Sequence, residues 1–187
     1  LLRAAVAGTN PQVVDTTNGF HPRDLLPAIK GVTQDDMPGY LSLVPTQLVQ
    51  CLDADEEVLA ALRSLSAILV GGAAISNHLL ERALNAGLKV RVTYGMTETA
   101  GGCVYDGEPM PGITVRAVDW DGRTRLAFNG PTLMTRYLDA DSPFFEEGGQ
   151  RWMVSGDMGV IRASGKVEVS GRADDVIISG GLSIAPG

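Results

Sequence analysis

The chain contains 187 residues, of which 44% are hydrophobic and 20% charged, and its formal net charge is -7. This length is enough for one large domain or two small ones, and the composition is ordinary for a globular protein. The acidic balance argues against a nucleic-acid partner, because proteins of that class normally carry a basic face. No apolar run approaches the ~20 residues that a membrane-spanning helix needs, so we expect no membrane association.

The two cysteines, Cys51 and Cys103, have no CxxC spacing and no neighbouring histidine. We therefore expect reduced thiols in a cytoplasmic protein, with no metal or redox role. The chain begins at Leu1 without an initiator methionine and stops at Gly187 without a tail. We interpret it as a piece of a longer protein.

The first half of the sequence alternates between strand and helix patterns. Strands are expected at 12–15, 40–44, 67–70 and 88–94, and helices at 22–30, 47–52, 56–63 and 77–86. Pro45 and Ser76 suit helix starts, whereas Gly31 and Gly87 suit helix ends. The segment 67–94 reads as a strand, helix and strand unit, so its two strands should be parallel.

Ligands of parallel sheets bind beyond the carboxyl ends of the strands. The loops 71–74 and 95–99 follow two neighbouring strands of the expected sheet. We therefore expect both loops to open on the same side and to form the walls of one site.

The pattern changes after about Gly101. Short alternating runs at 113–119, 124–128, 151–154, 159–162 and 166–170 are separated by Asp-Gly or Ser-Gly turns, which is typical of antiparallel strands. The sequence predicts an α/β fold: a doubly wound, mostly parallel sheet with helices on both faces, then a small antiparallel β subdomain that packs Trp120 and Trp152. The expected divisions are 1–107, incomplete at its N-terminus, 108–171 and 172–187.

Residues 94–99 concentrate groups that suit a nucleotide. Gly95 would let the backbone approach a ligand closely, and Thr97 offers a hydroxyl and an N–H to an anionic oxygen. Glu98 is a hard oxygen ligand suited to Mg²⁺, and Tyr94 supplies a flat face for a base. The alternative is a polar turn at the end of a strand.

Four short blocks of sequence resemble motifs of known enzymes. Residues 94–99 match the YGxTE motif, and 70–73 resemble the glycine loop on the adenine side. Residues 152–157 resemble the W…TGD block, with Ser155 in place of the usual Thr, and 171–181 resemble the GRxDDxIxxGG block. The sequence thus resembles the adenylate-forming superfamily of acyl-CoA synthetases, luciferases and adenylation domains, and most closely part of their large N-terminal domain.

The resemblance implies a role for each matching residue. Thr97 would contact the α-phosphate of ATP and Glu98 would hold Mg²⁺, which makes these two the catalytic candidates. The remaining nucleotide-binding candidates around the adenine are Gly71, Gly72, Ala73, Tyr94, Gly95 and Met96.

Three further residues acquire roles in the same way. Asp157 would accept hydrogen bonds from both ribose hydroxyls, for which an ionised carboxylate is well suited. Arg172 would reach the ribose and phosphate, and Asp174 would be the hinge on which a small C-terminal domain rotates. The alternatives are a turn aspartate before Met158 and Gly159, and a solvated ion pair for Arg172 and Asp174.

Segments 41–48, 71–75 and 94–107 resemble the o-succinylbenzoate–CoA ligases of menaquinone biosynthesis, the last of them the actinobacterial members. This resemblance implies ATP, Mg²⁺, CoA as co-substrate and an aromatic carboxylic acid, with a possible homodimer. Met96, Gly101 and Gly102 would then line the acyl pocket. Open alternatives are another aryl- or acyl-CoA ligase, a domain that loads a carrier protein, and a non-catalytic homologue that binds nucleotide.

The family also uses two lysines, one in a phosphate-binding loop and one at the reacting carboxylate. The lysines here are Lys30, Lys89 and Lys166, which suit a helix end, a strand start and a hairpin turn. The resemblance therefore predicts that this segment alone does not form an acyl-adenylate at a useful rate.

Overall fold

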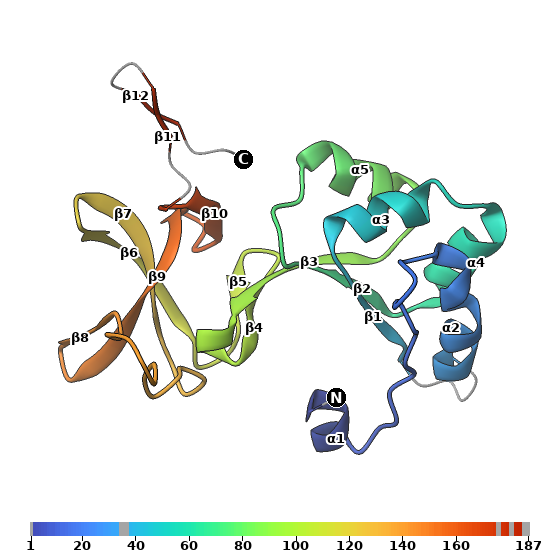
Figure 1. Ribbon diagram of the computed structural model, residues 1–187, viewed down its shortest axis with the longest axis horizontal. Coiled ribbons are helices and arrows are strands. Elements are labelled where there is room, and N and C mark those ends of the chain that lie inside the picture. Colours follow the sequence, from blue (N-terminus) through green and yellow to red (C-terminus); the bar gives the residue numbers. More distant parts are fainter. Residues whose placement is uncertain (1, 34–37, 175–176, 180–181, 185–187) are drawn as a thin grey trace. The chain divides into compact units, whose positions relative to one another are not determined.

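The computed structural model describes residues 2–33, 38–174, 177–179 and 182–184 (Figure 1). Contacts between residues divide the chain into two compact units, Leu1–Val92 and Thr93–Gly187, which are described separately below. Within the described residues, no helix is long and apolar enough to cross a membrane.

The first unit is built on a parallel sheet. Strands β1 (Tyr40–Leu43), β2 (Ala67–Val70) and the first half of β3 (Val90–Met96) pair in that order and all run parallel. Its helical elements are α1 (Leu2–Ala7), η1 (Pro22–Asp24), α2 (Leu25–Thr33), α3 (Pro45–Leu52), α4 (Glu56–Ser64) and α5 (Asn77–Asn85). The predicted strand, helix and strand unit is therefore confirmed as β2, α5 and β3.

Local signals begin and end these helices as their chemistry predicts. Ser76 caps α5 by accepting a hydrogen bond from Leu79 N at 3.2 Å, and Asp55 does the same for α4 from Val58 N at 3.2 Å. Gly87, at φ +79°, takes the left-handed conformation that follows the end of α5. Pro45 is the first residue of α3, as expected.

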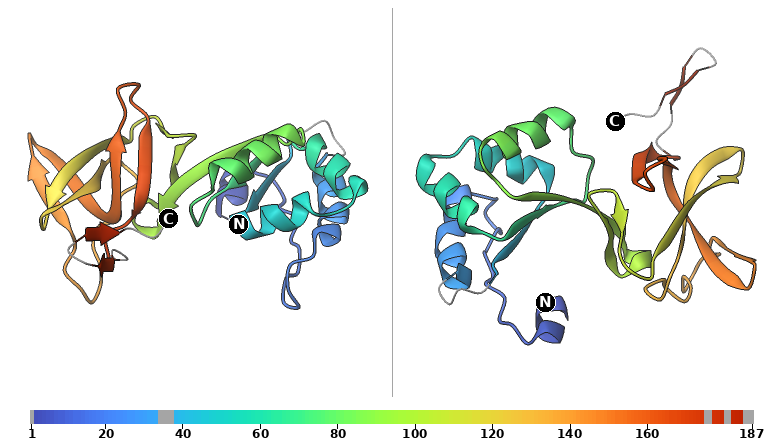
Figure 2. Two further views of the ribbon diagram at one scale, coloured as in Figure 1. Left: turned by 90° about the horizontal axis from the view of Figure 1, so that it is seen from above. Right: turned by 180° about the vertical axis from the view of Figure 1, so that it is seen from behind.

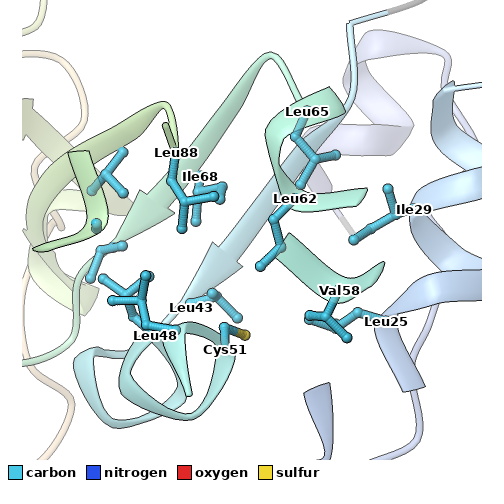
Figure 3. Packing of buried hydrophobic residues seen from close by; sticks show 14 of the residues in the cluster. Leu25, Ile29, Leu43, Leu48, Cys51, Val58, Leu62, Leu65, Ile68 and Leu88 are labelled. Atoms are coloured by element: carbon cyan, nitrogen blue, oxygen red, sulfur yellow. The ribbon is translucent and has the colours of Figure 1, made fainter. Parts of the chain in front are cut away.

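One face of the sheet carries the core of the first unit (Figure 3). Alternate residues of a strand point to opposite faces of the sheet, and the side chains of only one face enter this core. Those side chains meet apolar residues of α2, α3, α4 and α5, and the fully buried members include Leu48, Cys51, Val58, Leu62, Ile68 and Val70. Tyr40 lies on the opposite face and is 63% exposed. The α/β class is thus confirmed, and these four helices share one core with the sheet.

Two predictions near the N-terminus are wrong. Residues 12–15 form no strand: Val13 is 80% exposed, and Asp15 Oδ1 accepts a hydrogen bond from Thr17 N at 2.9 Å, which favours a turn. The expected helix 22–30 is a 3-10 turn followed by α2, which continues through Gly31 to Thr33. The packing of Ile29 in the core outweighs the weak helix propensity of glycine.

The second unit is antiparallel. The second half of β3 pairs with β4 (Gly101–Tyr105), which pairs with β5 (Glu108–Pro109). A separate curled sheet has the order β10-β9-β7-β6, with β8 also paired to β9 (Figure 1 and Figure 2). Its strands are β6 (Thr114–Trp120), β7 (Arg123–Asn129), β8 (Phe144–Glu147), β9 (Gln150–Ile161) and β10 (Val167–Arg172). Strands β11 (Ile177–Ser179) and β12 (Leu182–Ile184) form a two-stranded antiparallel sheet of their own.

The antiparallel subdomain is confirmed, but its strand count is larger than predicted. The expected strands 151–154 and 159–162 are one continuous strand, β9. Strands β4, β5, β8, β11 and β12 lie where the sequence pattern predicts none. The two-residue turns Asp106-Gly107 and Asp121-Gly122 both have positive φ angles, 51° and 81° in the first and 53° and 73° in the second. This is the geometry that joins tightly twisted hairpins. The division of the chain at 107/108 and 171/172 remains a prediction.

An aromatic layer covers one side of the curled sheet. Trp152 stacks on Phe145 at 6.4 Å between ring centroids, and Trp120 lies 6.1 Å from the same ring. The Arg116 guanidinium sits 4.1 Å from the Trp152 ring centroid and pairs with Glu147. Both tryptophans are packing residues, as the sequence predicted.

Candidate functional site

The turn after β3 differs from the loop predicted at 95–99. Gly95 and Met96 still belong to β3, and Thr97–Thr99 form a 3-10 turn, η2. Ala100 then takes a left-handed conformation at φ 56°, and β4 starts at once. The strand is longer than predicted because its second half finds a pairing partner in β4, which the sequence pattern did not reveal.

Thr99 holds this turn together. It is 2% exposed, and its hydroxyl accepts a hydrogen bond from Met96 N at 3.1 Å. The same hydroxyl lies 2.8 Å from the carbonyl oxygen of Gly101 and 3.1 Å from that of Met96, to which it can donate. Thr99 therefore has a structural use, and it fixes the backbone that presents Thr97 and Glu98.

Gly95 is required for packing of the hairpin. A Cβ atom on Gly95 would lie 2.1 Å from the carbonyl oxygen of Gly101 and 2.5 Å from Cα of Gly102. The sequence had suggested that Gly95 makes room for a ligand, and the structure shows that it makes room for the paired strand β4. Gly95 pairs with Gly102, and Met96 with Gly101.

Glu98 is held from two directions. Its carbonyl oxygen accepts a hydrogen bond from Met134 N at 2.8 Å, and its carboxylate oxygen Oε1 accepts one from the Tyr137 hydroxyl. This hydrogen bond, followed by burial and by the negative charge of Glu98, raises the pKa of Tyr137 to about 12. Tyr137 was not predicted as a site residue, because nothing in the local sequence links it to a position 39 residues earlier.

Asp157 projects from an irregularity in β9. Between the pairs Arg125–Met158 and Ala127–Val154, β9 has two more residues than β7 and therefore bulges. The buried Ser155 hydroxyl donates to Leu126 O at 3.0 Å and accepts from Asp157 N at 3.1 Å. The Ser155 hydroxyl thus satisfies two backbone groups at the bulge, and a Thr at this position would carry the same hydroxyl.

The Asp157 carboxylate faces the predicted base-binding tyrosine. Its Oδ2 accepts a hydrogen bond from the Tyr94 hydroxyl at 2.6 Å, and the Asp157 side chain is 16% exposed. Burial and then the bond to Asp157 raise the pKa of Tyr94 well above its usual range, so its hydroxyl stays protonated. The Tyr94 ring stacks on Phe128 at 5.7 Å between centroids. The alternative of a turn aspartate is wrong, since Asp157 lies inside a strand.

Arg172 joins the same group of side chains. It pairs in register with Asp157 in the β9–β10 ladder, and its guanidinium lies 3.9 Å from both Asp157 Oδ1 and Asp174 Oδ2. The Arg172 side chain is 58% exposed, so these loose ion pairs hold it weakly and leave it available to an anionic ligand. A Cβ atom on Gly156 would lie 2.9 Å from the same guanidinium, so the absence of a side chain at Gly156 leaves room for Arg172.

The second unit thus gathers four predicted residues. Tyr94 donates a hydrogen bond to Asp157, and Asp157 lies beside Arg172. The pKa of Tyr137 is raised chiefly by its hydrogen bond to Glu98, and the positive charge of Arg172 opposes this rise without cancelling it. In the described part of the chain no group of three histidine, cysteine or acidic side chains could hold a metal. A single carboxylate still fits Mg²⁺, because this ion commonly takes one or two carboxylates together with substrate phosphates.

The other predicted residues remain predictions as regards their roles. Gly71, Gly72 and Ala73 follow β2 in the first unit, where Gly71 N donates to Leu43 O at 3.2 Å and Gly72 has φ +80°. Met96 packs partly into the core of the second unit, which gives this acyl-pocket candidate a structural use. Residues 175–176 and 180–181 of the fourth block lie outside the described residues.

A family model described as AMP-binding enzyme matches residues 12–138. The chain belongs to the AMP-binding enzyme family. Along its whole length it is 38% identical to a probable 2-succinylbenzoate–CoA ligase of Mycobacterium tuberculosis and 30% identical to a 2-succinylbenzoate–CoA ligase of Lactococcus lactis. It spans 47% and 40% of the lengths of these AMP-binding relatives.

Solved structures of AMP-binding enzymes share the fold. The o-succinylbenzoate CoA synthetase of Bacillus subtilis in complex with its acyl-adenylate intermediate matches 99% of this chain and 40% of that one, with a TM-score of 0.75 and 25% identity. A malonyl-CoA ligase with methylmalonyl-CoA and AMP bound matches 89% of this chain and 40% of that one, with a TM-score of 0.65 and 33% identity. The resemblance read from the four sequence blocks is therefore confirmed at the level of the family.

Proposed function

We propose that the protein is part of an ATP-dependent acid–CoA ligase that activates o-succinylbenzoate as an acyl-adenylate and transfers it to CoA. The observation that carries the proposal is the cluster of Tyr94, Asp157 and Arg172 in the same unit as a Glu98 carboxylate that Tyr137 holds by a hydrogen bond. The 38% identity to the mycobacterial ligase over the whole chain supports the substrate. The pathway would be menaquinone biosynthesis and the compartment the cytoplasm.

The residues of the cluster match the demands of adenylation. A carboxylate oxygen of the acid attacks the α-phosphorus of ATP, and the bond to pyrophosphate breaks. Both reactants are anions, so catalysis depends on positioning and on neutralising charge. Bound Mg²⁺ would supply positive charge at the phosphates, with Glu98 as its ligand from the protein. Thr97 would contact the α-phosphate beside it.

The nucleoside half of ATP would be held by the remaining residues. Asp157 would exchange its hydrogen bond from Tyr94 for bonds from the ribose hydroxyls, and Arg172 would reach the ribose and the phosphate. The Tyr94 ring, which has Phe128 on one face, would offer its other face to adenine. By the sequence resemblance alone, Gly71, Gly72 and Ala73 of the first unit and Gly95 and Met96 of the second remain the other proposed nucleotide-binding residues.

In the second half-reaction the CoA sulfur attacks the acyl carbon and AMP leaves. Gly101 and Gly102 would stand with Met96 at the acyl group, and Asp174 would be the hinge for the change between half-reactions. The malonyl-CoA ligase likeness favours one alternative, a ligase for a different acid, because that structure is 33% identical over its match.

The product identifies the reaction. The longest native form of the protein that contains this chain is incubated with ATP, Mg²⁺, CoA and one acid at a time from a panel of o-succinylbenzoate, benzoate, malonate and a fatty acid. Mass spectrometry should detect the o-succinylbenzoyl-CoA thioester. A thioester of another acid only would overturn the substrate, and an adenylate that CoA does not release would favour a domain that loads a carrier protein.

Asp157→Asn should weaken binding of AMP by about 10-fold, because hydrogen bonds to a charged acceptor are worth about 1.5–3 kcal/mol and an amide retains only one acceptor oxygen. Isothermal titration calorimetry with AMP measures the change. The matched control is Asp119→Asn on β6, where the side chain is exposed, and it should bind AMP as the wild type does. Equal affinities for the two variants would remove Asp157 from the ribose site.

A further inference from the structure

Residues 130–142, which make up all but the last residue of the segment between β7 and β8, contain no helix or strand, and hydrogen bonds hold them at several points. Arg151 of β9 donates to the carbonyl oxygens of Met134, at 3.2 Å, and Thr135. Tyr137 N donates to the Ser142 hydroxyl at 2.8 Å, which closes the end of the segment. We call residues 130–142 the strap.

The strap contacts Glu98 twice. Met134 N donates to the Glu98 carbonyl oxygen at 2.8 Å, which fixes the backbone, and the Tyr137 hydroxyl donates to Oε1, which fixes the side chain. The two donors are three residues apart on the strap, so its conformation sets both contacts together. Glu98 is therefore positioned by a segment that follows it in sequence by more than 30 residues.

The second contact selects one orientation of the carboxylate. A free glutamate side chain samples many rotamers, and fixing it costs up to about 2 kcal/mol of conformational entropy. The hydrogen bond from Tyr137 restricts the Glu98 side chain before any ligand binds, so less conformational entropy is lost when a cation binds. The bond engages Oε1, which leaves the other carboxylate oxygen for a metal ion. Hydrogen bonds of this kind to a ligating carboxylate typically change metal affinity by about 10–100-fold.

We propose that Tyr137 is a positioning residue that orients the Glu98 carboxylate for the divalent cation that enters with the nucleotide. This inference rests on the proposed function, since it requires Glu98 to ligate the cation. In this role Tyr137 would act through Glu98, without contacting the nucleotide or the acid itself. Its side chain is only half-buried, and the next residue, Leu138, is 86% exposed, so the hydroxyl is not needed to satisfy a closed core.

Tyr137→Phe removes the hydroxyl and keeps the ring. The test measures binding of α,β-methylene-ATP by calorimetry, once with MgCl₂ and once with EDTA, so that no turnover is needed. The tightening of binding by Mg²⁺ should fall by about 10-fold in Tyr137→Phe, whereas binding in EDTA should not change. Tyr40→Phe makes the same chemical change at an exposed tyrosine and should leave both affinities as in the wild type.

A second variant separates positioning from a general structural effect. Glu98→Gln should also lose the tightening by Mg²⁺, and adding Tyr137→Phe to it should cause little further loss, because coupled residues are not additive. If Tyr137→Phe weakens binding equally in MgCl₂ and EDTA, the hydroxyl is structural and the inference is wrong. If Tyr137→Phe behaves as Tyr40→Phe while the wild type binds with Mg²⁺ dependence, the inference alone fails. If the wild type binds no nucleotide, the proposed function and the inference both fail.

Discussion

Glu98→Gln should lower the rate of acid-dependent ATP–pyrophosphate exchange by about 100-fold or more. A metal ion at a phosphoryl centre is worth several kcal/mol of charge stabilisation, and each 1.36 kcal/mol corresponds to a factor of about 10 in rate. The amide keeps the size of the side chain and can still accept the Tyr137 hydrogen bond, so the fold should be unaffected. What is lost is the negative charge that a hard cation prefers.

The dependence on Mg²⁺ concentration distinguishes this cause from others. In Glu98→Gln, the Mg²⁺ concentration for half-maximal exchange should rise, and high Mg²⁺ should restore part of the rate. Glu146→Gln is the control, because Glu146 is an exposed residue of β8. Unchanged exchange and an unchanged Mg²⁺ response in Glu98→Gln would mean that Glu98 does not ligate the metal.

Gly95→Ala should destabilise the protein by about 3 kcal/mol, and should therefore lower the midpoint of thermal unfolding by about 6–12 °C. The added methyl would lie 2.1 Å from the carbonyl oxygen of Gly101, far inside van der Waals contact. That oxygen belongs to the backbone of the paired strand and accepts a hydrogen bond from the Thr99 hydroxyl, with 2.8 Å between the two oxygens. It therefore cannot move without opening the turn. Because the turn carries Thr97 and Glu98, exchange activity should fall as well.

The matched control lies across the same pair of strands. A Cβ on Gly102 would meet the Tyr105 hydroxyl at 2.8 Å, which is the end of a side chain that can rotate away. Gly102→Ala should therefore cost less than about 1 kcal/mol, as measured by circular dichroism during heating. Equal midpoints for the two variants would contradict the close approach of β3 and β4 at Gly95.

Local sequence signals predicted the parts of the fold that are formed by residues close together in the sequence. The unit of β2, α5 and β3 was readable because Ser76, Gly87 and the apolar runs all lie within about 30 residues and agree with one another. The Asp-Gly turns were equally readable from their dipeptides. The division of β9 into two strands was wrong, since the polar Ser-Gly-Asp stretch looks like a loop and only its pairing with β7 and β10 makes it a strand.

The candidate site was predictable in its parts but not in its contacts. Tyr94, Glu98, Asp157 and Arg172 were found because short blocks carry them. The hydrogen bonds from Tyr94 to Asp157 and from Tyr137 to Glu98 join residues 63 and 39 positions apart, and no periodicity encodes such pairs. The structural role of Thr99 was not predictable, because a threonine at a strand end gives no sign that its hydroxyl will be buried among backbone groups.

The structure gives ordinary uses to two of the three lysines. Lys89 Nζ donates to the carbonyl oxygens of Leu65 and Arg63 at 3.0 and 3.3 Å, and Lys166 lies 3.7 Å from Glu108. These contacts support the prediction that the 187-residue chain alone forms no acyl-adenylate at a useful rate, which stays a prediction. The possible homodimer, the hinge at Asp174 and the acyl-pocket residues stay predictions too.

Acid-dependent exchange of labelled pyrophosphate into ATP tests the central claim most directly, because it reports adenylation without requiring CoA. The longest native form of the protein that contains this chain is assayed with o-succinylbenzoate and with the other acids of the panel. Exchange driven chiefly by o-succinylbenzoate, and lowered by about 100-fold or more in Glu98→Gln, is the result that we predict. Absence of exchange with every acid, from a protein of verified mass that is folded, would contradict it.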